Sequence, residues 1–563
     1  MKRVLLAVIT VAGLFAFAAP TRHRAARSPF GNDIDGEIFA KLAANDIEPA
    51  RVAGDEEFLR RITVDLTGTI PTASEVDAFL ADTASDKRAK KIDALLRSEA
   101  FTDRWTMWFG DLVQNVQVST NSREYYLGRN AYYSWIRASV AANKPYDAMV
   151  RELLAGEGNN FDSGVANYVV RQLQPNGPPQ DTYDNLAAHS AEKFLGLPML
   201  CISCHDGQGH LESVNWYLRG KSREDFWKMA AFFARTAARG ERYTDPANPN
   251  ANIIRFQVAL NSVGSYRLNT TDGNKSPRQP KTGQNAVVTP AFITNGEQPR
   301  LGESYRAAYG RILTADRQFA RNTVNLLWKE MFGRGIVEPA NSFDPAKLST
   351  QATHPELLEK LTDTFIAKNY DLREMLRMMA LSNVYQLSAR YDGPQPADSY
   401  FARRQPRRMQ AEVLMDAIAT ATNSRLSFNV QGLGIVDRAM EFPDPLDGRG
   451  TAPGRFMGNF GRGDRDDVAR SNDSAISQAL AMLNDRAVTD RVKRTSTSTV
   501  GILTSTLTDR GQIVERLYLA TLSRKPTAEE KRIAVDYLNS GPLAERAEDL
   551  QYVLINSLEF LFV

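Results

Sequence analysis

Apolar residues recur at intervals of three and four positions over most of this chain of 563 residues. The pattern is clearest in residues 56–113 and returns in residues 319–339, 354–388 and 407–422. Because this spacing places apolar side chains along one face of a helix, it predicts amphipathic helices that pack against one another. With 43% hydrophobic and 24% charged residues, the chain can fill large cores. The fold is therefore predicted to be mainly α-helical.

Two predicted helices begin with the same pattern, Pro-Thr-x-x-Glu. Thr72 and Thr527 are placed to cap the first turn, and Glu75 and Glu530, three residues further on, can reach back to the amide of the capping residue. The pattern is a favourable helix start in any context. We therefore interpret the recurrence as two similar helix starts rather than as an internal repeat.

A change of composition separates two helical regions. Residues 241–300 are rich in Asn, Pro, Gly and Thr and contain short alternating apolar runs, which is typical of loops and short strands. The sequence predicts a helical domain at 33–240, an irregular linker with a few short β-strands at 241–300, and a second helical domain at 301–563. Within the first domain, helices are predicted at 184–195 and 223–238.

Residues 1–19 have the pattern of a cleaved secretory signal peptide. Lys2 and Arg3 are followed by an apolar run at 4–17 and by small residues around an Ala-x-Ala site. No other stretch approaches the length of apolar sequence that a spanning helix needs, so no transmembrane span is predicted in the mature chain. An uncleaved N-terminal anchor is the alternative. The expected location is secreted or periplasmic.

The net charge of +3 is spread over intermixed acidic and basic residues. Proteins that bind nucleic acid usually carry a basic stripe or a block of basic residues. The sequence therefore predicts no nucleic-acid partner.

The only two cysteines, Cys201 and Cys204, lie three positions apart, and His205 follows directly. An exported chain with one possible disulfide is not held together by a disulfide framework. C-x-x-C-H is the attachment sequence of c-type haem, in which two thiols a short loop apart bind the two vinyl groups and the histidine binds the iron. The motif predicts one covalent haem c, with Cys201 and Cys204 as thioether anchors and His205 as the proximal ligand of the haem iron.

Two other chemistries use a similar motif. A thiol–disulfide redox site has C-x-x-C, but usually at the start of a helix that follows a strand, whereas this motif follows a predicted helix. A zinc site would need a third or fourth ligand, and only distant histidines could complete Cys201, Cys204 and His205. Haem is the interpretation that the context favours.

The opposite face of the iron has several candidate ligands. His210 is the preferred one, because Met199 lies too close to the motif to reach that face. Met229 and His189 are the next nearest, and His189 and His354 have the sequence context of packed or surface residues. A histidine or methionine at this position would give an electron carrier, whereas an open position would permit peroxide chemistry.

Aromatic residues around the motif could line an apolar haem pocket. Their spacing in predicted helices is also that of packing residues, which is the preferred interpretation for most of them. They are Trp105, Trp108, Trp216, Phe226, Trp227, Phe232 and Phe233.

Longer phrases of the sequence resemble a known pair of domains. EEFLRRITVDLTGTIPTASEVDAFLAD, YYSWIRASVAANKPYDAMVRELLAG and KFLGLPMLCISCHDG resemble the planctomycete-type secreted cytochrome-like family, a domain of unknown function found in exported proteins. ARNTVNLLWKEMFGRGIVEP, YDLREMLRMMALSNVYQLS and FGRGDRDD resemble the domain, also of unknown function, that habitually follows it. Together the two resemblances cover most of the predicted mature chain.

The resemblance implies little about the reaction. The family is grouped with cytochromes because of its C-x-x-C-H, which Cys201, Cys204 and His205 match, and its members often accompany exported sulfatase-like or polysaccharide-processing proteins. Many members have a second histidine two positions after the first, where this chain has Gly207 and its next histidine is His210. Many also carry cysteines after the F-G-R-x-D-R phrase, where this chain has Val468 and Ala469.

Three functional hypotheses follow. The favoured one is an exported c-type haem protein that transfers electrons to or from a periplasmic redox partner or an exported enzyme. The second is a non-catalytic scaffold or binding module for extracellular polymer processing, with a disulfide between Cys201 and Cys204. The third is a haem peroxidase-like enzyme, which needs an exchangeable position on the iron.

Overall fold

The computed structural model describes residues 32–117, 125–174, 176–273, 275–466, 468–471 and 473–563. About 52% of the chain is helical, and the described residues contain 25 α-helices and seven strands. The predicted mainly α fold is thus confirmed. The predicted signal peptide, residues 1–19, lies outside the described residues. None of the described helices has both the length and the apolar run that crossing a membrane would require.

Eleven helices form the N-terminal part of the molecule. They are α1 (Asp33–Ala44), α2 (Asp55–Thr67), α3 (Ala73–Ala81), α4 (Lys87–Leu96), α5 (Glu99–Leu112), α6 (Tyr126–Ala141), α7 (Tyr146–Ala155), α8 (Ala166–Arg171), α9 (Pro179–Ser190), α10 (Trp216–Arg219) and α11 (Arg223–Ala230). The helix predicted at 184–195 is the second half of α9 followed by a π-helical turn, Ala191–Leu195. This turn leads the chain into the cysteine motif.

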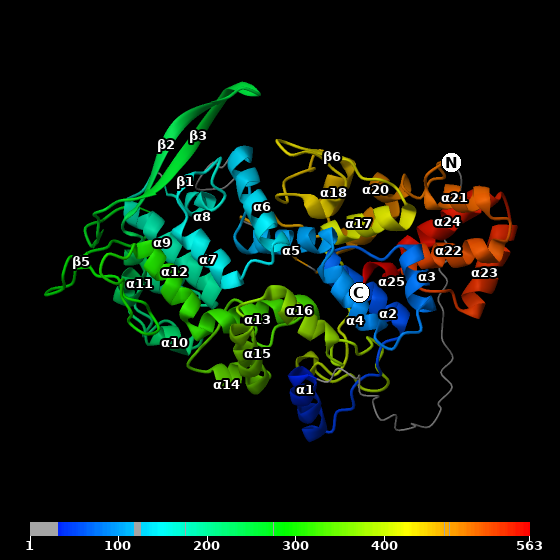
Figure 1. Ribbon diagram of the computed structural model, residues 1–563, viewed down its shortest axis with the longest axis horizontal. Coiled ribbons are helices and arrows are strands. Elements are labelled where there is room, and N and C mark those ends of the chain that lie inside the picture. Colours follow the sequence, from blue (N-terminus) through cyan, green and yellow to red (C-terminus); the bar gives the residue numbers. More distant parts are fainter. Residues whose placement is uncertain (1–31, 118–124, 175, 274, 467, 472) are drawn as a thin grey trace.

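The region between the two sets of helices contains a long antiparallel hairpin. Its strands β2 (Thr236–Asp245) and β3 (Asn248–Leu260) stand out from the body of the molecule (Figure 1), and β1 (Gly158–Asn159) pairs with the base of β3. The helix predicted at 223–238 is wrong in its second half. From Thr236 onward the chain pairs with β3, and these strand hydrogen bonds replace helical ones.

Two further pairs of short strands are present, and fourteen helices follow the hairpin. The strands are β4 (Tyr266–Arg267) with β5 (Val287–Val288) and β6 (Phe428–Val430) with β7 (Gly434–Val436). The helices are α12 (Tyr305–Ala315), α13 (Arg317–Phe332), α14 (Leu348–Gln351), α15 (Pro355–Ala367), α16 (Leu372–Leu381), α17 (Ala411–Thr422), α18 (Ala452–Gly458), α19 (Ile476–Asn484), α20 (Arg486–Thr489), α21 (Thr499–Thr506), α22 (Arg510–Leu522), α23 (Ala528–Asn539), α24 (Leu543–Ile555) and α25 (Leu558–Leu561).

Both predicted capping boxes are present. The Thr72 hydroxyl accepts from the Glu75 amide and the Glu75 carboxylate accepts from the Thr72 amide, and Thr527 and Glu530 do the same at the start of α23. Each pair provides hydrogen-bond acceptors for two backbone N–H groups that would otherwise have no partner at the helix end. These two helix starts were therefore correctly predicted from local sequence.

The apolar side chains form two cores. The larger one runs from Ile34 to Ala402 and so includes α12–α16, while the second contains residues from Met409 to Phe560. A few side chains cross over, such as Met107 of α5, which packs in the second core. The change of core therefore falls between Ala402 and Met409, and α12–α16 pack with the N-terminal helices although they follow the hairpin in sequence.

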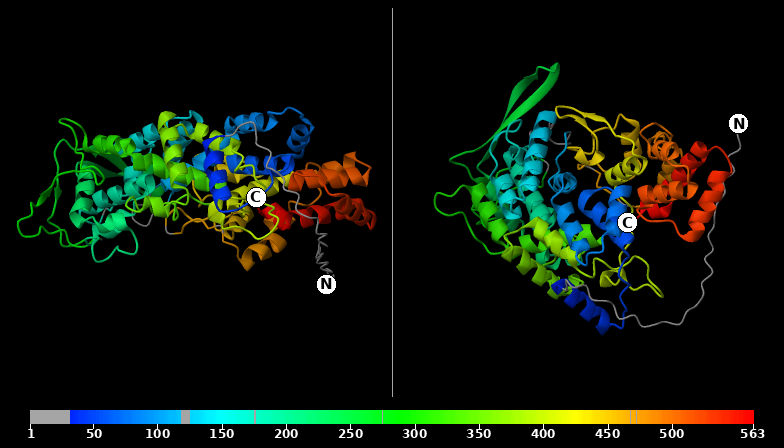
Figure 2. Two further views of the ribbon diagram at one scale, coloured as in Figure 1. Left: turned by 90° about the horizontal axis from the view of Figure 1, so that it is seen from below. Right: turned by 45° about the vertical axis from the view of Figure 1, so that its right-hand side comes forward.

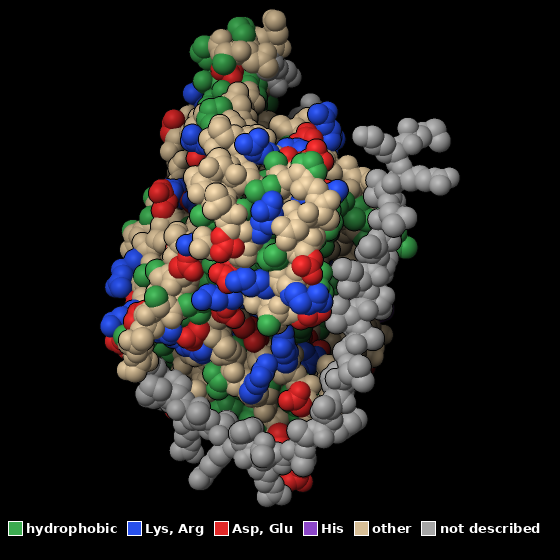
Figure 3. Space-filling model, turned by 90° about the vertical axis from the view of Figure 1, so that its right-hand side faces the viewer, with side chains coloured by type: hydrophobic (Ala, Val, Ile, Leu, Met, Phe, Trp, Pro, Cys, Tyr) green, Lys and Arg blue, Asp and Glu red, His purple; other side chains and the backbone are tan. Residues whose placement is uncertain are grey.

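The molecule is broad in one view and thin in the view from below (Figure 2). The helices α8–α12 and the hairpin lie at one end, and α21–α24 lie at the other (Figure 1). Basic and acidic side chains are interspersed over the face that is formed at the α21–α24 end of the molecule (Figure 3). Their mixing in the sequence suggested this distribution.

Candidate functional site

The cysteine motif lies on a surface loop that is anchored by buried apolar residues. The π-helical turn ends at Gly196, whose φ of 65° is left-handed and whose missing Cβ leaves room for Asn322 and Phe343. A short 3-10 helix, Met199–Ser203, follows. Met199 and Ile202 are fully buried, whereas Cys201 and Cys204 are exposed. The loop is thus fixed from below and presents both thiols outward.

The Cys204 thiol has the environment of a reactive cysteine. Its Sγ lies 3.5 Å from the Ser203 hydroxyl. Burial raises its pKa, but hydrogen bonds from Ser203 and Ser276 and the charge of Lys275 outweigh this effect, so the pKa lies below its ordinary value. Because the thiolate is the nucleophile, Cys204 is suited to forming a bond to carbon or sulfur.

The His205 imidazole is oriented by its own backbone neighbour. Its Nδ1 lies 2.9 Å from the Asp206 carbonyl oxygen. In the tautomer that donates from Nδ1, the lone pair remains on Nε2, and this arrangement is common for histidines that bind metals. Together with two exposed thiols, this donor set fits a covalently attached haem. Leu200, Val214 and Trp216 are exposed nearby and offer apolar surface for such a group.

His210 lies directly beside His205 rather than across from it. The two ring centres are 4.2 Å apart and the rings are tilted by 41°. Two rings this close leave no room for a haem between them. For His210 to be the sixth ligand, the turn at residues 207–210 would have to open. Its assignment stays a prediction.

The backbone packs closely against itself at Gly207. A Cβ at position 207 would collide with the Leu218 carbonyl oxygen of α10. The close approach of these two backbone segments requires glycine. The structure therefore has no room for a side chain two positions after His205.

The other candidate ligands are engaged in packing. Met199 is fully buried, and the Met229 sulfur accepts a hydrogen bond of 3.2 Å from the Ile293 amide. Burial, aided by Lys193, lowers the pKa of His189 to about 4, and burial together with Lys41 does the same for His354. These two imidazoles are therefore neutral at physiological pH, which suits the packed role that their sequence context suggested.

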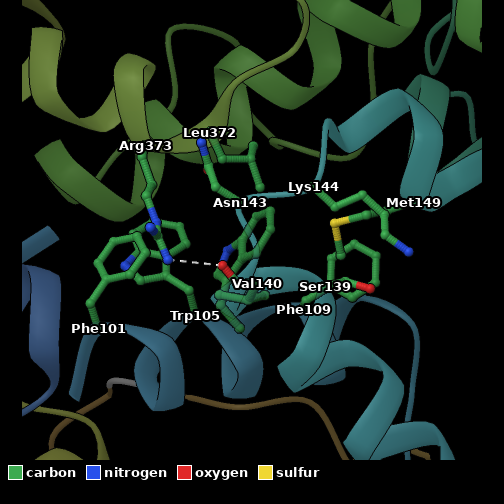
Figure 4. Close-up of a pocket in the computed structure, with 11 residues that line it drawn as sticks. Phe101, Trp105, Phe109, Ser139, Val140, Asn143, Lys144, Met149, Leu372 and Arg373 are labelled. Atoms are coloured by element: carbon green, nitrogen blue, oxygen red, sulfur yellow. Dashed lines mark hydrogen bonds between the residues drawn. The ribbon is translucent and has the colours of Figure 1, made fainter. Parts of the chain in front are cut away.

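Most of the aromatic residues that by their sequence position could line a haem pocket are packed in the core. Phe101, Trp105, Trp108 and Phe109 line a cavity of only about 20 Å³, which is the size of a water molecule and far too small for a haem (Figure 4). Over it, Arg373 of α16 donates a 3.0 Å hydrogen bond to the Val140 carbonyl of α6. Phe226, Trp227, Phe232 and Phe233 are buried as well, and Trp216 alone of the predicted set is exposed.

A clamp centred on Arg223, which sequence reasoning missed, holds the motif loop. Its guanidinium donates to the carbonyl oxygens of Ser203 at 2.9 Å, Ser276 at 2.8 Å and Pro277 at 3.0 Å. Its amide donates to the Asp206 carboxylate at 2.8 Å. The motif is therefore tied to the segment around Ser276, within the stretch predicted to be a linker. No spacing rule relates these positions.

Beneath this segment lies a buried ionic cluster. Arg278 is fully buried and donates to Asp181 at 2.5 Å and to Asp184 at 2.7 Å, and the Tyr266 hydroxyl also donates to Asp184 at 2.7 Å. Burial raises the pKa of Asp184 to about 6, although Arg278 acts against the rise. One guanidinium thus shares its charge between two carboxylates. The residues just before Arg278, Ser276 and Pro277, supply the carbonyl oxygens to which Arg223 donates.

Two family models match the chain, and together they cover most of it. Residues 33–238 match the PSCyt2 family model, described as a protein of unknown function (DUF1549), and residues 306–538 match the PSD1 model, described as a protein of unknown function (DUF1553). No curated protein and no solved structure matches. The first match contains the complete cysteine motif and the Arg223 clamp residue.

Proposed function

We propose, from the premise that the chain belongs to the PSCyt2 and PSD1 families, that it is an exported protein with one covalent haem c that transfers electrons in the periplasm or at the cell surface. The observation that carries the proposal is the donor set on the motif loop. Two exposed thiols stand next to an imidazole whose Nδ1 is held by a backbone carbonyl. This is the chemistry that c-type haem requires.

The residues of the loop have separate roles in this proposal. Cys201 and Cys204 hold the haem through thioether bonds, and His205 binds its iron through Nε2. The bound haem supplies one-electron chemistry. Arg223 keeps the backbone of Ser203 in place, so that both thiols and the imidazole stay on one surface.

Exposure of the motif favours electron transfer over a reaction on an enclosed substrate. A buried active site would need a cavity beside the iron ligand, whereas Cys201, Cys204 and the adjacent Leu200 face solvent. An exposed cofactor edge allows a redox partner to approach closely. The partner that we propose is a periplasmic redox protein or an exported enzyme.

A haem-stained denaturing gel of the exported chain tests the proposal. The full chain is produced in a host with haem c attachment machinery, beside Cys201→Ser, Cys204→Ser and the double variant. We expect a stained band for the wild type, a weak one for each single variant and none for the double variant. Free thiols without haem, or a mass two daltons below that of the reduced chain, would overturn the proposal, and the lower mass would indicate the disulfide of the scaffold hypothesis.

A second measurement separates a carrier from a peroxidase-like enzyme. Cyanide or imidazole is titrated into the oxidised holoprotein, and the visible spectrum is recorded. A six-coordinate carrier resists low ligand concentrations, whereas an open position binds them readily. Binding at micromolar cyanide, together with peroxide turnover, would replace electron transfer with peroxidase chemistry.

A further inference from the structure

A basic cavity lies in the second core region, far in sequence from the cysteine motif. Its volume is about 420 Å³, and α18, α20 and the loop before α21 form its walls. Arg455, Arg486, Arg491 and Lys493 line it against a single carboxylate, Asp490, which leaves the lining with a net charge of +3. A hollow with so strong an excess of one charge attracts ligands of the opposite charge.

Arg491 lines the cavity and has a donor to spare. Its Nη1 donates to the Ser424 carbonyl at 3.1 Å and to the Ser424 hydroxyl at 2.9 Å, which fixes the guanidinium. Its Nε is buried without a hydrogen-bond partner in the described structure. A buried N–H without a partner is energetically unfavourable. Arg491 lines the cavity, so its guanidinium has hydrogen-bonding capacity left for a ligand oxygen there.

Arg455 lines the cavity from α18 and is exposed. Its Nη1 donates to the Gly450 carbonyl at 2.9 Å, an acceptor without charge. Arg486 and Lys493 are already paired, with Asp490 at 3.1 Å and Glu548 at 3.0 Å. Neither Arg455 nor Arg491 forms an ion pair within the described residues, although Asp416 and Asp490 lie close enough to act on Arg491. These two arginines are therefore the cations of the cavity that remain for a ligand.

The loop before α21 lines one side of the cavity and ends in a helix N-terminus. Thr495 and Ser498 exchange hydrogen bonds, with the Thr495 amide donating to the Ser498 hydroxyl at 2.9 Å and the Ser498 amide donating to the Thr495 hydroxyl at 3.0 Å. Ser498 then caps α21. The first turn of this helix adds partial positive charge on the same side as the cations.

We propose that this cavity binds a small ligand through a tetrahedral oxyanion, a phosphate or sulfate ester, held by Arg455 and Arg491. A guanidinium fits two oxygens of such a group at once. The volume falls within the range of small-molecule sites, about 300–1,000 Å³, and exceeds the size of a bare oxyanion. A sugar-sized remainder therefore fits beside the oxyanion. The proposal does not depend on the presence of haem.

Calorimetric titration of the full chain tests this site. The probes are glucose 6-phosphate, glucose 6-sulfate, inorganic phosphate, inorganic sulfate and glucose, each at constant ionic strength. We expect both esters to bind, the inorganic ions to bind more weakly, and glucose not to bind. Tighter binding of one ester than of the other would identify the phosphate or the sulfate as the natural group.

Variants locate the binding. Arg455→Gln removes an exposed cation without disturbing the core, and we expect it to weaken ester binding at least tenfold. Arg425→Gln is the matched control, because Arg425 is also exposed, at 81%, and is paired with Asp437 outside the cavity. It should change the affinity less than twofold. Equal losses in the two variants, binding of glucose alone, or no ester binding at 10 mM ligand would overturn the proposal.

Discussion

Two buried arginine–carboxylate clusters in this molecule differ in their ratio of arginines to carboxylates. Beneath the cysteine motif, Arg278 serves both Asp181 and Asp184. In the second core region, Glu412 lies between Arg462 and Arg470, with both nitrogen–oxygen distances at 2.7 Å. Arg470 also pairs with Asp111, which Arg465 contacts in turn, so three arginines here serve two carboxylates. Burial alone would raise the pKa of either carboxyl, but only the second cluster has enough positive charge to reverse the effect.

The outcome is a pair of opposite pKa shifts. Burial raises the pKa of Asp184 to about 6 despite Arg278, whereas the charges of Arg470 and Arg462 outweigh burial and lower the pKa of Glu412 to about 2. The ratio of arginines to carboxylates therefore decides the sign of the shift, and the presence of an ion pair alone does not. The Glu412 cluster suits permanent structure, while the Asp184 cluster, beneath the motif, responds to mild acid.

Breaking the Glu412 cluster should have the largest effect. Glu412→Gln leaves the buried Arg462 guanidinium without its carboxylate and Arg470 with Asp111 alone, so we expect the free energy of unfolding at pH 7 to fall by about 3–5 kcal/mol. Urea denaturation followed by circular dichroism measures the loss. Glu529→Gln, at an exposed carboxylate paired with Arg532, is the control and should leave the free energy of unfolding unchanged, because solvent screens an exposed pair. A loss below about 1 kcal/mol for Glu412→Gln would contradict this account.

Acid should remove the same contribution from the wild type. A lowered pKa gives stability that is present above the unfolded pKa of 4.5 and is lost as pH falls through about 2. At about 1.4 kcal/mol for each pH unit, this amounts to roughly 3 kcal/mol. The difference in unfolding free energy between wild type and Glu412→Gln should therefore shrink by that amount between pH 5 and pH 2. A constant difference over this range would show that the Glu412 pKa is not depressed.

The Asp184 cluster should have the opposite pH dependence. A raised carboxyl pKa gives stability that is present below the unfolded pKa of 3.8 and is lost as pH rises through about 6. We expect the free-energy difference between wild type and Asp184→Asn to shift by roughly 3 kcal/mol between pH 4 and pH 7, against the wild type at the higher pH. Denaturation at four pH values measures it, with the exposed Asp536→Asn as control. Parallel curves would refute the raised pKa.

The features that could be predicted from the sequence are those that depend on residues close together in the chain. The capping boxes at Thr72 and Thr527 form within one turn, so their pattern is sufficient. The motif at Cys201, Cys204 and His205 could likewise be identified from spacing alone, although its haem remains to be tested. Helical periodicity also gave the fold class, because it reports which face of a helix is buried.

What the sequence could not give is the partner of each buried face or charge. Periodicity shows which face of a helix is apolar, but not which core that face enters. It could therefore not predict that α12–α16 pack with the N-terminal helices. Arg278 meets Asp184 across 94 residues, and Arg223 meets Ser276 across 53. Such pairings arise only when tertiary packing brings the segments together. The stretch called a linker from its composition therefore contains half of the clamp on the motif.

The smallest expected effect concerns the coupling between the clamp and the thiol. Arg223 holds the Ser276 carbonyl, and its charge favours the Cys204 thiolate. Arg223→Gln should release the segment around Ser276 and raise the pKa of Cys204 toward its ordinary value. At pH 7 a smaller fraction of Cys204 would then be thiolate, so its alkylation should slow by about two- to threefold.

Mass spectrometry of haem-free protein after timed iodoacetamide treatment follows this rate, with Cys201 in the same sample as the internal reference. Lys281→Gln is the matched control, because Lys281 also faces the motif but forms only an exposed pair, 3.3 Å from Asp206. It should leave the Cys204 rate unchanged, since an exposed pair is screened by solvent and holds no backbone in place. Faster alkylation in Arg223→Gln would mean that the clamp shields the thiol rather than activating it. Equal slowing in both variants would assign the effect to general charge and not to the clamp.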